Sequence, residues 1–365
     1  MRIALIISSL ECGGAEKVFY LLAQALTRIG HQIHVITLKD TPDFFEFGPE
    51  VHRTRLCVER PSSGFISAIK NNFIKLRTLR KTLKNIDPHV AISFMTRANV
   101  LLILATMGLN LKTIITEHTV TSFEHKGLWQ WLRRKLYPLA DKLVCISNQV
   151  GVQYSWMPPN LVSIIHNPIL PSEVDSTVTL DKNSIVAVGR LVHEKAFDVL
   201  IRAFALVAKK GNPHNWSLTI VGEGPDRSEL EFLIQSLNLG GSVKLVGQTK
   251  YPASYLKQAA IFVLSSRLEG FGNVIVEAML SKVPVISTDA GGCQREIISD
   301  QVTGILVPPE NPAKLAEAIT YLMANPQIRL NLGTAGFNAA SIYLPSHIGE
   351  KWHNLLIGLV PGTSA

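Results

Sequence analysis

Two carboxylates stand eight positions apart in the last third of the chain, Glu269 in a glycine-containing loop and Glu277 within a predicted helix. We expect residues 272–281 to be helical, because apolar residues such as Val274 recur there and no proline interrupts them. A strand is predicted just before this loop, over 261–264. Amides at a helix start bind anions, and carboxylates accept hydrogen bonds from hydroxyl groups. The pattern therefore favours a site for a diphosphate joined to a polyhydroxylated group.

The segment from Glu269 to Met279 resembles the E-x7-E signature of the retaining glycosyltransferases of family 4. In that family the first glutamate contacts the donor sugar at the reacting centre, and the second binds the ribose of the nucleotide. The resemblance therefore implies a catalytic Glu269 and a donor-binding Glu277. It also implies donor contacts from the residues between them: Phe271, Gly272, Asn273 and Val274. The spacing alone also fits two surface acids, but the surrounding Gly-Phe-Gly-Asn and Glu-Ala-Met favour the family.

Further donor motifs follow other predicted strands. Arg190 and Lys195 match the G-R-x4-K element, which in the family binds the donor diphosphate; a guanidinium forks onto phosphate oxygens and an ammonium adds a compact charge. Ala196 stands where the family usually has glycine. Gly222, in a Val-Gly-Glu-Gly-Pro turn like that of the family, is expected to support the nucleotide. Val246 ends a predicted strand that resembles the one whose backbone the family uses against the base. Arg190 and Lys195 could also be a solvated charged pair at the start of a helix.

The first half contributes two candidates. Gly13 and Gly14 resemble the family's GGAE turn, where free amides meet the donor phosphate or the acceptor. No third glycine completes a dinucleotide fingerprint, which disfavours an NAD enzyme. His118 ends a predicted strand and resembles a family histidine near the reacting centre, where it could donate a hydrogen bond or share charge. A histidine there could equally be a structural residue.

The segment 289–297 is longer than in the commonest family members. Its length is closer to that of bacterial glycosyltransferases that extend lipid-linked oligosaccharides, which favours N-acetylgalactosamine or galactose donors. Helix packing alone could also shape this loop.

The elements that must position these residues form two α/β domains. A chain of 365 residues exceeds one ordinary core, and 47% hydrophobic with 18% charged residues is typical of a globular protein. Short apolar runs between helices predict parallel sheets covered on both faces. We predict strands over 3–7, 33–38, 90–94, 113–116 and 142–146 in the first half, and over 185–188, 218–221, 243–246, 261–264, 284–287 and 305–307 in the second.

The resemblance implies the GT-B fold, with two Rossmann-like domains whose parallel sheets face each other across a cleft. Residues 1–167 would bind the acceptor, and residues 168–345 would bind the nucleotide sugar. The polar, proline-containing segment 166–183 is the expected linker. A C-terminal helix within 346–365 would cross back to the first domain.

Composition also indicates which metal sites, disulfides and membrane segments the protein lacks. Four scattered cysteines form neither a metal-binding pattern nor a disulfide framework. The apolar region 90–111 is interrupted by Arg97 and Asn99 and is too polar for a membrane span. The apolar start lacks a cleavage site and is predicted to be a buried strand. We therefore expect no cysteine metal site and a cytoplasmic protein. The resemblance further implies an enzyme without a metal or cofactor, for which the nucleotide sugar is a substrate.

The net charge of +8 favours an anionic partner, such as nucleic acid or an anionic membrane surface. Basic residues alternate with apolar ones between positions 70 and 84, at helical spacing, and Trp129, Trp131 and Arg133 lie in a second such cluster. We expect these faces to bind anionic headgroups or a lipid diphosphate, although either could simply be solvated. The residues assigned to this acceptor or membrane contact are Lys75, Arg77, Arg80 and Lys81.

The expected activity is transfer of a hexose or N-acetylhexosamine from a UDP-sugar to a polyprenyl-diphosphate-linked glycan, with retention of configuration and without a metal. The enzyme would associate peripherally with the inner face of the cytoplasmic membrane. Two alternatives remain: a UDP-sugar epimerase of the same fold, and a basic non-enzymatic protein that binds membranes or nucleic acid. The donor motifs argue against the second, so we expect no nucleic-acid partner.

Overall fold

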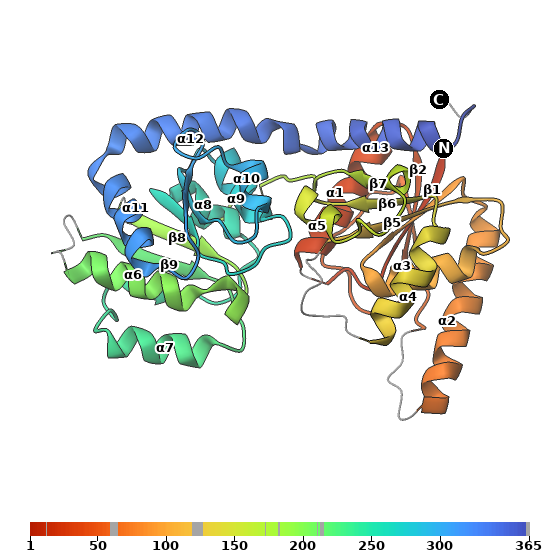
Figure 1. Ribbon diagram of the computed structural model, residues 1–365, viewed down its shortest axis with the longest axis horizontal. Helices are drawn as coiled ribbons and strands as arrows, with labels where there is room; N and C mark the ends of the chain where they lie inside the picture. The colour runs from red at the N-terminus through yellow and green to blue at the C-terminus, as the bar shows by residue number, and fades with distance from the viewer. Residues whose placement is uncertain are drawn as a thin grey trace. The chain divides into compact units, whose positions relative to one another are not determined.

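The computed structural model describes residues 1–11, 13–58, 65–118, 127–171, 173–181, 183–209, 211 and 215–362. The chain forms two compact units, one made of Met1–Pro168 with Tyr343–Ala365 and the other of Ile169–Ile342. We call them unit 1 and unit 2. Figure 1 traces the chain through both units from red to blue.

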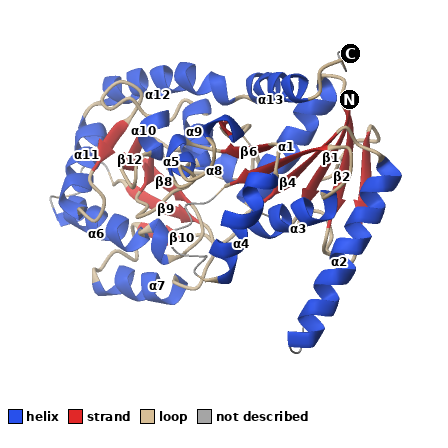
Figure 2. Cartoon of the chain, turned by 45° about the vertical axis from the view of Figure 1, so that its right-hand side comes forward, coloured by secondary structure: helices blue, strands red, loops and turns tan. Residues whose placement is uncertain are grey.

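Unit 1 contains a parallel sheet of seven strands in the order β3-β2-β1-β4-β5-β6-β7. The strands are drawn in red in Figure 2. They are β1 (Arg2–Ile7), β2 (Gln32–Thr37), β3 (Val51–Arg55), β4 (Val90–Phe94), β5 (Lys112–Glu117), β6 (Lys142–Cys145) and β7 (Val162–Ile164). The edge strands β3 and β7 were not predicted.

Helices cover both faces of this sheet. On one face, α1 (Gly14–Arg28) and α13 (Pro345–Leu359) enclose the apolar side chains of β1, β2 and β4. On the other face lie α2 (Phe65–Ile86) and α3 (Thr96–Thr106). The remaining short helices are α4 (Leu128–Leu136), η1 (Tyr137–Leu139), α5 (Asn148–Val152) and η2 (Pro159–Leu161).

Helix α13 packs closely on α1 although the two are far apart in the sequence (Figure 1). A Cβ at Gly349 would stand 3.0 Å from the Cβ of Ala25, so the helices approach closely at this glycine. One turn further on, Trp352 is only 3% exposed and belongs to the core between α1 and the sheet. The C-terminal helix is therefore an integral part of unit 1.

Unit 2 contains a parallel sheet of six strands in the order β10-β9-β8-β11-β12-β13. The strands are β8 (Ser184–Val188), β9 (Ser217–Val221), β10 (Val243–Leu245), β11 (Ile261–Leu264), β12 (Val285–Thr288) and β13 (Ile305–Val307). All six were predicted from their apolar runs. The helical segments are η3 (His193–Lys195), α6 (Phe197–Lys209), α7 (Arg227–Ser236), α8 (Pro252–Gln258), α9 (Asn273–Leu280), α10 (Cys293–Ile297), α11 (Pro312–Ala324) and α12 (Pro326–Ala340).

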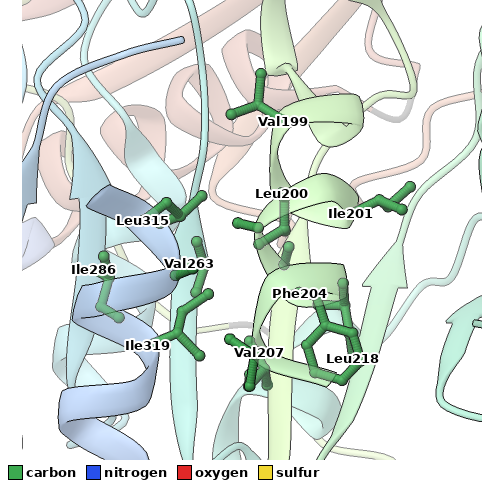
Figure 3. Close-up of a cluster of buried hydrophobic side chains, with 14 of the residues drawn as sticks. Val199, Leu200, Ile201, Phe204, Val207, Leu218, Val263, Ile286, Leu315 and Ile319 are labelled. Atoms are coloured by element: carbon green, nitrogen blue, oxygen red, sulfur yellow. The ribbon is translucent and has the colours of Figure 1, made fainter. Parts of the chain in front are cut away.

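A large hydrophobic core of unit 2 lies between its sheet and the helices α6 and α11. Figure 3 shows Leu315 and Ile319 of α11 beside Val263 of β11, with Phe204 of α6 in the same cluster. All four side chains are fully buried. Two parallel sheets, each with helices packed against it, confirm the predicted pair of Rossmann-like domains.

The packing of α13 generates a stability prediction. Replacing Trp352 with alanine removes a large buried side chain and leaves a cavity, at a cost of about 3–5 kcal/mol in the free energy of unfolding of unit 1. We expect scanning calorimetry to show a lower transition temperature for Trp352→Ala. Lys351→Ala, at the exposed neighbouring position, is the matched control and should unfold like the wild type. Equal transitions in the two variants would show that α13 does not stabilise unit 1.

Candidate active site

The candidate donor residues of unit 2 gather at one edge of its sheet. In a parallel sheet the carboxyl ends of all strands meet at the same edge, where ligands bind in open α/β folds. Arg190 and Lys195 follow β8, Gly222 follows β9, Val246 follows β10 and Glu269 follows β11. The strand order places β9 and β11 on either side of β8, so these loops are neighbours.

The ion pair between Lys195 and Glu269 is the central contact of this edge. The ammonium Nζ of Lys195 donates to Oε1 of Glu269, across 74 positions of sequence. The hydroxyl of Ser266 donates to the same oxygen at 2.7 Å. The side chains of Lys195 and Glu269 are 23% and 10% exposed. A positive and a negative group are therefore fixed together, partly shielded from water, at the end of the sheet.

Further hydrogen bonds fasten the loop after β11 to the η3 turn. Arg267 donates its backbone N–H to the carbonyl of Glu194 at 2.7 Å, and its Nη1 to the carbonyl of His193 at 2.6 Å. The hydroxyl of Ser265 donates to the carbonyl of Lys195 at 2.9 Å. These contacts hold Lys195 against the loop that carries Glu269. Sequence reasoning missed Ser265, Ser266 and Arg267, although all three lie within four residues of Glu269.

The backbone conformation of Ala196 explains why the family usually has glycine at this position. Its φ and ψ are +51° and 41°, in the left-handed region, where a Cβ is unfavourable. The residue is also buried, with 1% exposure. The small methyl group of alanine is compatible with this turn, so the η3 geometry is kept.

The second carboxylate lies on α9. Gly272 precedes the helix with a left-handed φ of +89°, which favours glycine, and Asn273 is the first helical residue. Phe271 is buried beneath this turn, whereas Val274 is half-buried. Glu277 is 7% exposed, in the second turn of the helix.

Gly222 has a steric reason to be glycine. A Cβ there would stand 1.8 Å from the carbonyl oxygen of Gly189, which precedes Arg190, and φ is +151°. The N–H of Gly222 donates to the carbonyl of Gly247 at 2.9 Å. The turns after β8, β9 and β10 are thereby brought together. Arg190 is exposed, and Val246 is 42% exposed.

In unit 1, the candidate residues follow β1 and β5, with β4 between these strands. Gly13 precedes α1 in an extended conformation with φ of −163°, which any residue adopts, and Gly14 begins the helix with an exposed position. A Cβ on Gly13 would meet only the flexible end of Glu16 at 2.2 Å. The backbone of this turn therefore does not by itself require glycine at position 13.

His118 is held from two sides. Its ring stacks on Phe94 with centroids 4.9 Å apart, and its Nε2 lies 2.9 Å from the hydroxyl oxygen of Thr116. Its Nδ1 is buried and has no hydrogen-bond partner among the residues that the structure describes. The ring lines a small cavity together with His166 and Asn167. Burial lowers the pKa of His118 from 6.5 to about 4, so the ring is neutral at pH 7.

A buried polar network lies next to His118, and sequence reasoning missed it. Glu117 is 1% exposed and accepts hydrogen bonds from the hydroxyls of Thr96, at 3.0 Å, and Tyr137. Arg133 of α4 lies 4.0 Å from the same carboxylate and is also buried, so the expectation that it faces anionic headgroups was wrong. The network therefore attaches α4 to the end of β5, directly before His118.

The structure separates the four basic residues assigned to an acceptor or membrane contact. Arg80 donates from Nη1 to the carbonyls of Ala105 and Met107, at 2.8 and 2.7 Å, and so joins α2 to the end of α3. Arg77 and Lys81 are exposed. At 100° per residue, Lys75 lies on the opposite side of the helix from them and is half-buried.

An exposed basic stripe remains along α2. It contains Arg77 and Lys81, and with them the residues Lys70, Phe73, Ile74 and Lys84, all exposed. Phe73 is 60% and Ile74 is 42% exposed. The stripe thus combines positive charge with apolar side chains.

Within the described ranges, no group of three or more His, Cys, Asp or Glu side chains is placed to hold a metal ion. Among the helices of those ranges, none has both the length and the apolar character that crossing a membrane requires.

Comparison with known proteins decides the family. Residues 12–173 match Glycosyltransferase Family 4, and residues 173–339 match Glycosyl transferases group 1. The chain is a glycosyltransferase with a family 4 domain and a group 1 domain. It is therefore a hexosyltransferase, as the donor motifs predicted.

Relatives cover nearly the whole enzyme. It is 28% identical over 357 residues to the Campylobacter jejuni GalNAc-alpha-(1->4)-GalNAc-alpha-(1->3)-diNAcBac-PP-undecaprenol alpha-1,4-N-acetyl-D-galactosaminyltransferase, covering 98% of each chain. Sucrose-phosphate synthase from Thermosynechococcus elongatus superposes with a TM-score of 0.83 at 22% identity, over 98% of each chain. HepE from Anabaena in complex with UDP-glucose superposes with a TM-score of 0.75 at 19% identity, over 98% of the enzyme and all of that chain. These likenesses confirm the GT-B fold.

Buried histidines make the stability of this glycosyltransferase depend on pH. Burial lowers the pKa values of His31 and His118 to about 4, with the N-terminal charge and His353 adding to the effect at His31. Below pH 6.5 the unfolded chain takes up protons at these residues and the folded chain does not, so acid favours unfolding.

We expect stability to be constant from pH 8 to 6.5 and to fall towards pH 5, by about 1–2 kcal/mol for each histidine. Denaturant unfolding at several pH values measures this slope. His31→Gln removes one titrating group and should flatten the slope, while Gln32→Ala, at the exposed neighbouring position, should not. The same slope in both variants would contradict the assignment.

Proposed function

We propose that the enzyme transfers a hexose or N-acetylhexosamine from a UDP-sugar to a polyprenyl-diphosphate-linked glycan, with retention of configuration. The observation that carries this proposal is the contact between Lys195 and Glu269 at the carboxyl ends of β8 and β11. It joins a group suited to a diphosphate with a group suited to a developing sugar cation. The relative that acts on an undecaprenol-linked glycan and the fold neighbour that holds UDP-glucose support the two substrates.

In this proposal the donor lies over the strand ends of unit 2. The exposed guanidinium of Arg190 and the ammonium of Lys195 bind the diphosphate, and Glu277 binds the ribose. Gly222 and Val246 line the donor site through their backbone. In unit 1, the amides at Gly13 and Gly14 are proposed to meet the donor phosphate or the acceptor. Phe271, Gly272, Asn273 and Val274 shape its wall at the start of α9.

The reaction follows from the charges of these groups. As the glycosidic bond breaks, negative charge grows on the UDP phosphate, where Arg190 and Lys195 neutralise it without a metal. Positive charge grows on the sugar, where the carboxylate of Glu269 stabilises it. The acceptor hydroxyl attacks from the same face and gives its proton to the departing phosphate oxygen, which accounts for retention. In unit 1, His118 contributes a contact to a substrate hydroxyl.

The proposal also places the enzyme at the inner face of the cytoplasmic membrane, where a lipid-linked acceptor would be presented. The exposed basic stripe of α2 supports peripheral association, because positive side chains attract anionic headgroups and apolar ones enter the interface. Arg77 and Lys81 belong to this surface. Lys75 and Arg80 are left out, because one lies on the other side of the helix and the other is bonded to α3.

A conservative substitution tests the catalytic assignment. Glu269→Gln keeps the shape of the side chain but removes the charge that stabilises the sugar, so we expect turnover to fall by about 10²–10³-fold. The measurement is UDP release from a panel of UDP-sugars, with a polyprenyl-diphosphate glycan and a chelator present. Circular dichroism checks folding.

Glu229→Gln, at an exposed position on α7, makes the same change of charge away from the strand ends and should retain activity. Unchanged turnover in Glu269→Gln would remove that residue from the mechanism. Conversion of the UDP-sugar without acceptor would favour the epimerase alternative. Absence of any nucleotide release from the wild type would favour a binding protein.

A second test concerns the membrane surface. The double variant Arg77→Ala/Lys81→Ala should bind anionic vesicles about tenfold or more weakly, since each surface charge contributes about 1 kcal/mol. Sedimentation with phosphatidylglycerol vesicles measures the affinity. Lys75→Ala/Lys257→Ala removes two positive charges outside the stripe and should bind like the wild type. Equal losses in both variants would show that net charge alone, and not the stripe, drives binding.

A further inference from the structure

The hydroxyl group of Thr116 has two partners but only one proton. Its oxygen Oγ1 lies 2.9 Å from the carbonyl oxygen of Ser93 and 2.9 Å from Nε2 of His118. A carbonyl oxygen can only accept a hydrogen bond, so the proton of Thr116 is directed to Ser93. The same oxygen then accepts the second hydrogen bond. Nε2 of His118 must therefore carry a proton and donate it to Thr116.

This geometry decides the tautomer of His118. A neutral imidazole carries one N–H, and here it is at Nε2, so Nδ1 has the lone pair. The ring is neutral at pH 7, because burial lowers its pKa to about 4. Nδ1 is buried and without a hydrogen-bond partner in the described part of the chain. An acceptor atom of this kind is costly to bury unless a hydroxyl or amide hydrogen reaches it.

The surroundings keep this arrangement rigid. Thr116 is 1% exposed at the end of β5, and its backbone carbonyl accepts hydrogen bonds from the N–H of Met95 and from Nδ2 of Asn99. Phe94 stacks against the imidazole with an angle of 24° between the rings. The contacts of the β5 end thus fix the position of Oγ1 of Thr116, and stacking on Phe94 fixes the plane of the imidazole ring.

We propose that Thr116 is a positioning residue that fixes His118 as the Nε2–H tautomer, so that Nδ1 accepts a hydrogen bond from a substrate hydroxyl. The inference rests on the proposed function, in which His118 contacts a substrate. It reverses the direction expected from the sequence, where the histidine was a candidate donor. A hydroxyl of the sugar or acceptor satisfies Nδ1, whereas a carbonyl or phosphate oxygen would be repelled by it.

The tautomer can be measured without any turnover. In the full chain labelled with ¹⁵N-histidine, the two ring nitrogens of a neutral imidazole have well-separated chemical shifts that identify the protonated one. His118→Gln assigns the signals by their loss. We expect the wild type to show the Nε2–H form. Thr116→Val removes the hydroxyl with little change of shape and should give a mixture of tautomers, while Thr116→Ser should restore the Nε2–H form.

Transfer activity should follow the tautomer. Thr116→Val is expected to lower kcat roughly tenfold, the cost of one misdirected hydrogen bond, with Thr116→Ser close to the wild type. An unchanged tautomer in Thr116→Val overturns the positioning role, whatever the activity. A changed tautomer with full activity overturns the contact between Nδ1 and a substrate. If the wild type transfers no sugar, the proposed function fails, and the tautomer measurement still decides the role of Thr116.

Discussion

Parallel strand pairing is the constraint on which the candidate site depends. All strands of each sheet run in one direction, so their carboxyl ends meet at one edge and the loops that follow them become neighbours. Lys195 and Glu269 are 74 positions apart and yet in contact, because β8 and β11 are adjacent in the sheet. Helices on both faces make these strands inaccessible and rigid, which leaves the loops at the strand ends as the place for chemistry.

Every strand with neighbours on both sides was predicted from the sequence, as were the edge strands β10 and β13 of unit 2. β1, β4, β8 and β11 are continuous apolar runs because both faces and both edges of each are covered. β3, with the sequence Val-His-Arg-Thr-Arg, is paired only with β2 and keeps polar side chains at a sheet edge. β7 has three residues and one partner. The hydrophobic pattern is weak in β3 and β7, so these two edge strands of unit 1 were not predicted.

The residues of the candidate site also differ in whether the sequence alone could identify them. Glu269 and Lys195 could be found because their types and spacing carry the chemistry, whereas Ser266 and Arg267 act through contacts that only the folded loops create. Charge alone also failed to sort the basic residues of α2. Arg80 is a structural residue because the end of α3 happens to present two carbonyl groups to it. Helical spacing could have separated Lys75 from the stripe, but no sequence pattern indicates a partner on another helix.

The ion pair of Lys195 and Glu269 also gives a physical reason for using two opposite charges in one site. A carboxylate with 10% exposure is costly to hold alone, and the neighbouring ammonium lowers that cost. In the proposed reaction, a bound diphosphate competes for the same ammonium. As its charge grows on bond cleavage, Lys195 is drawn towards the phosphate, and the negative charge of Glu269 becomes less compensated beside the sugar. Stabilisation of the leaving group and of the sugar cation would then increase together, at the stage of the reaction where both charges develop.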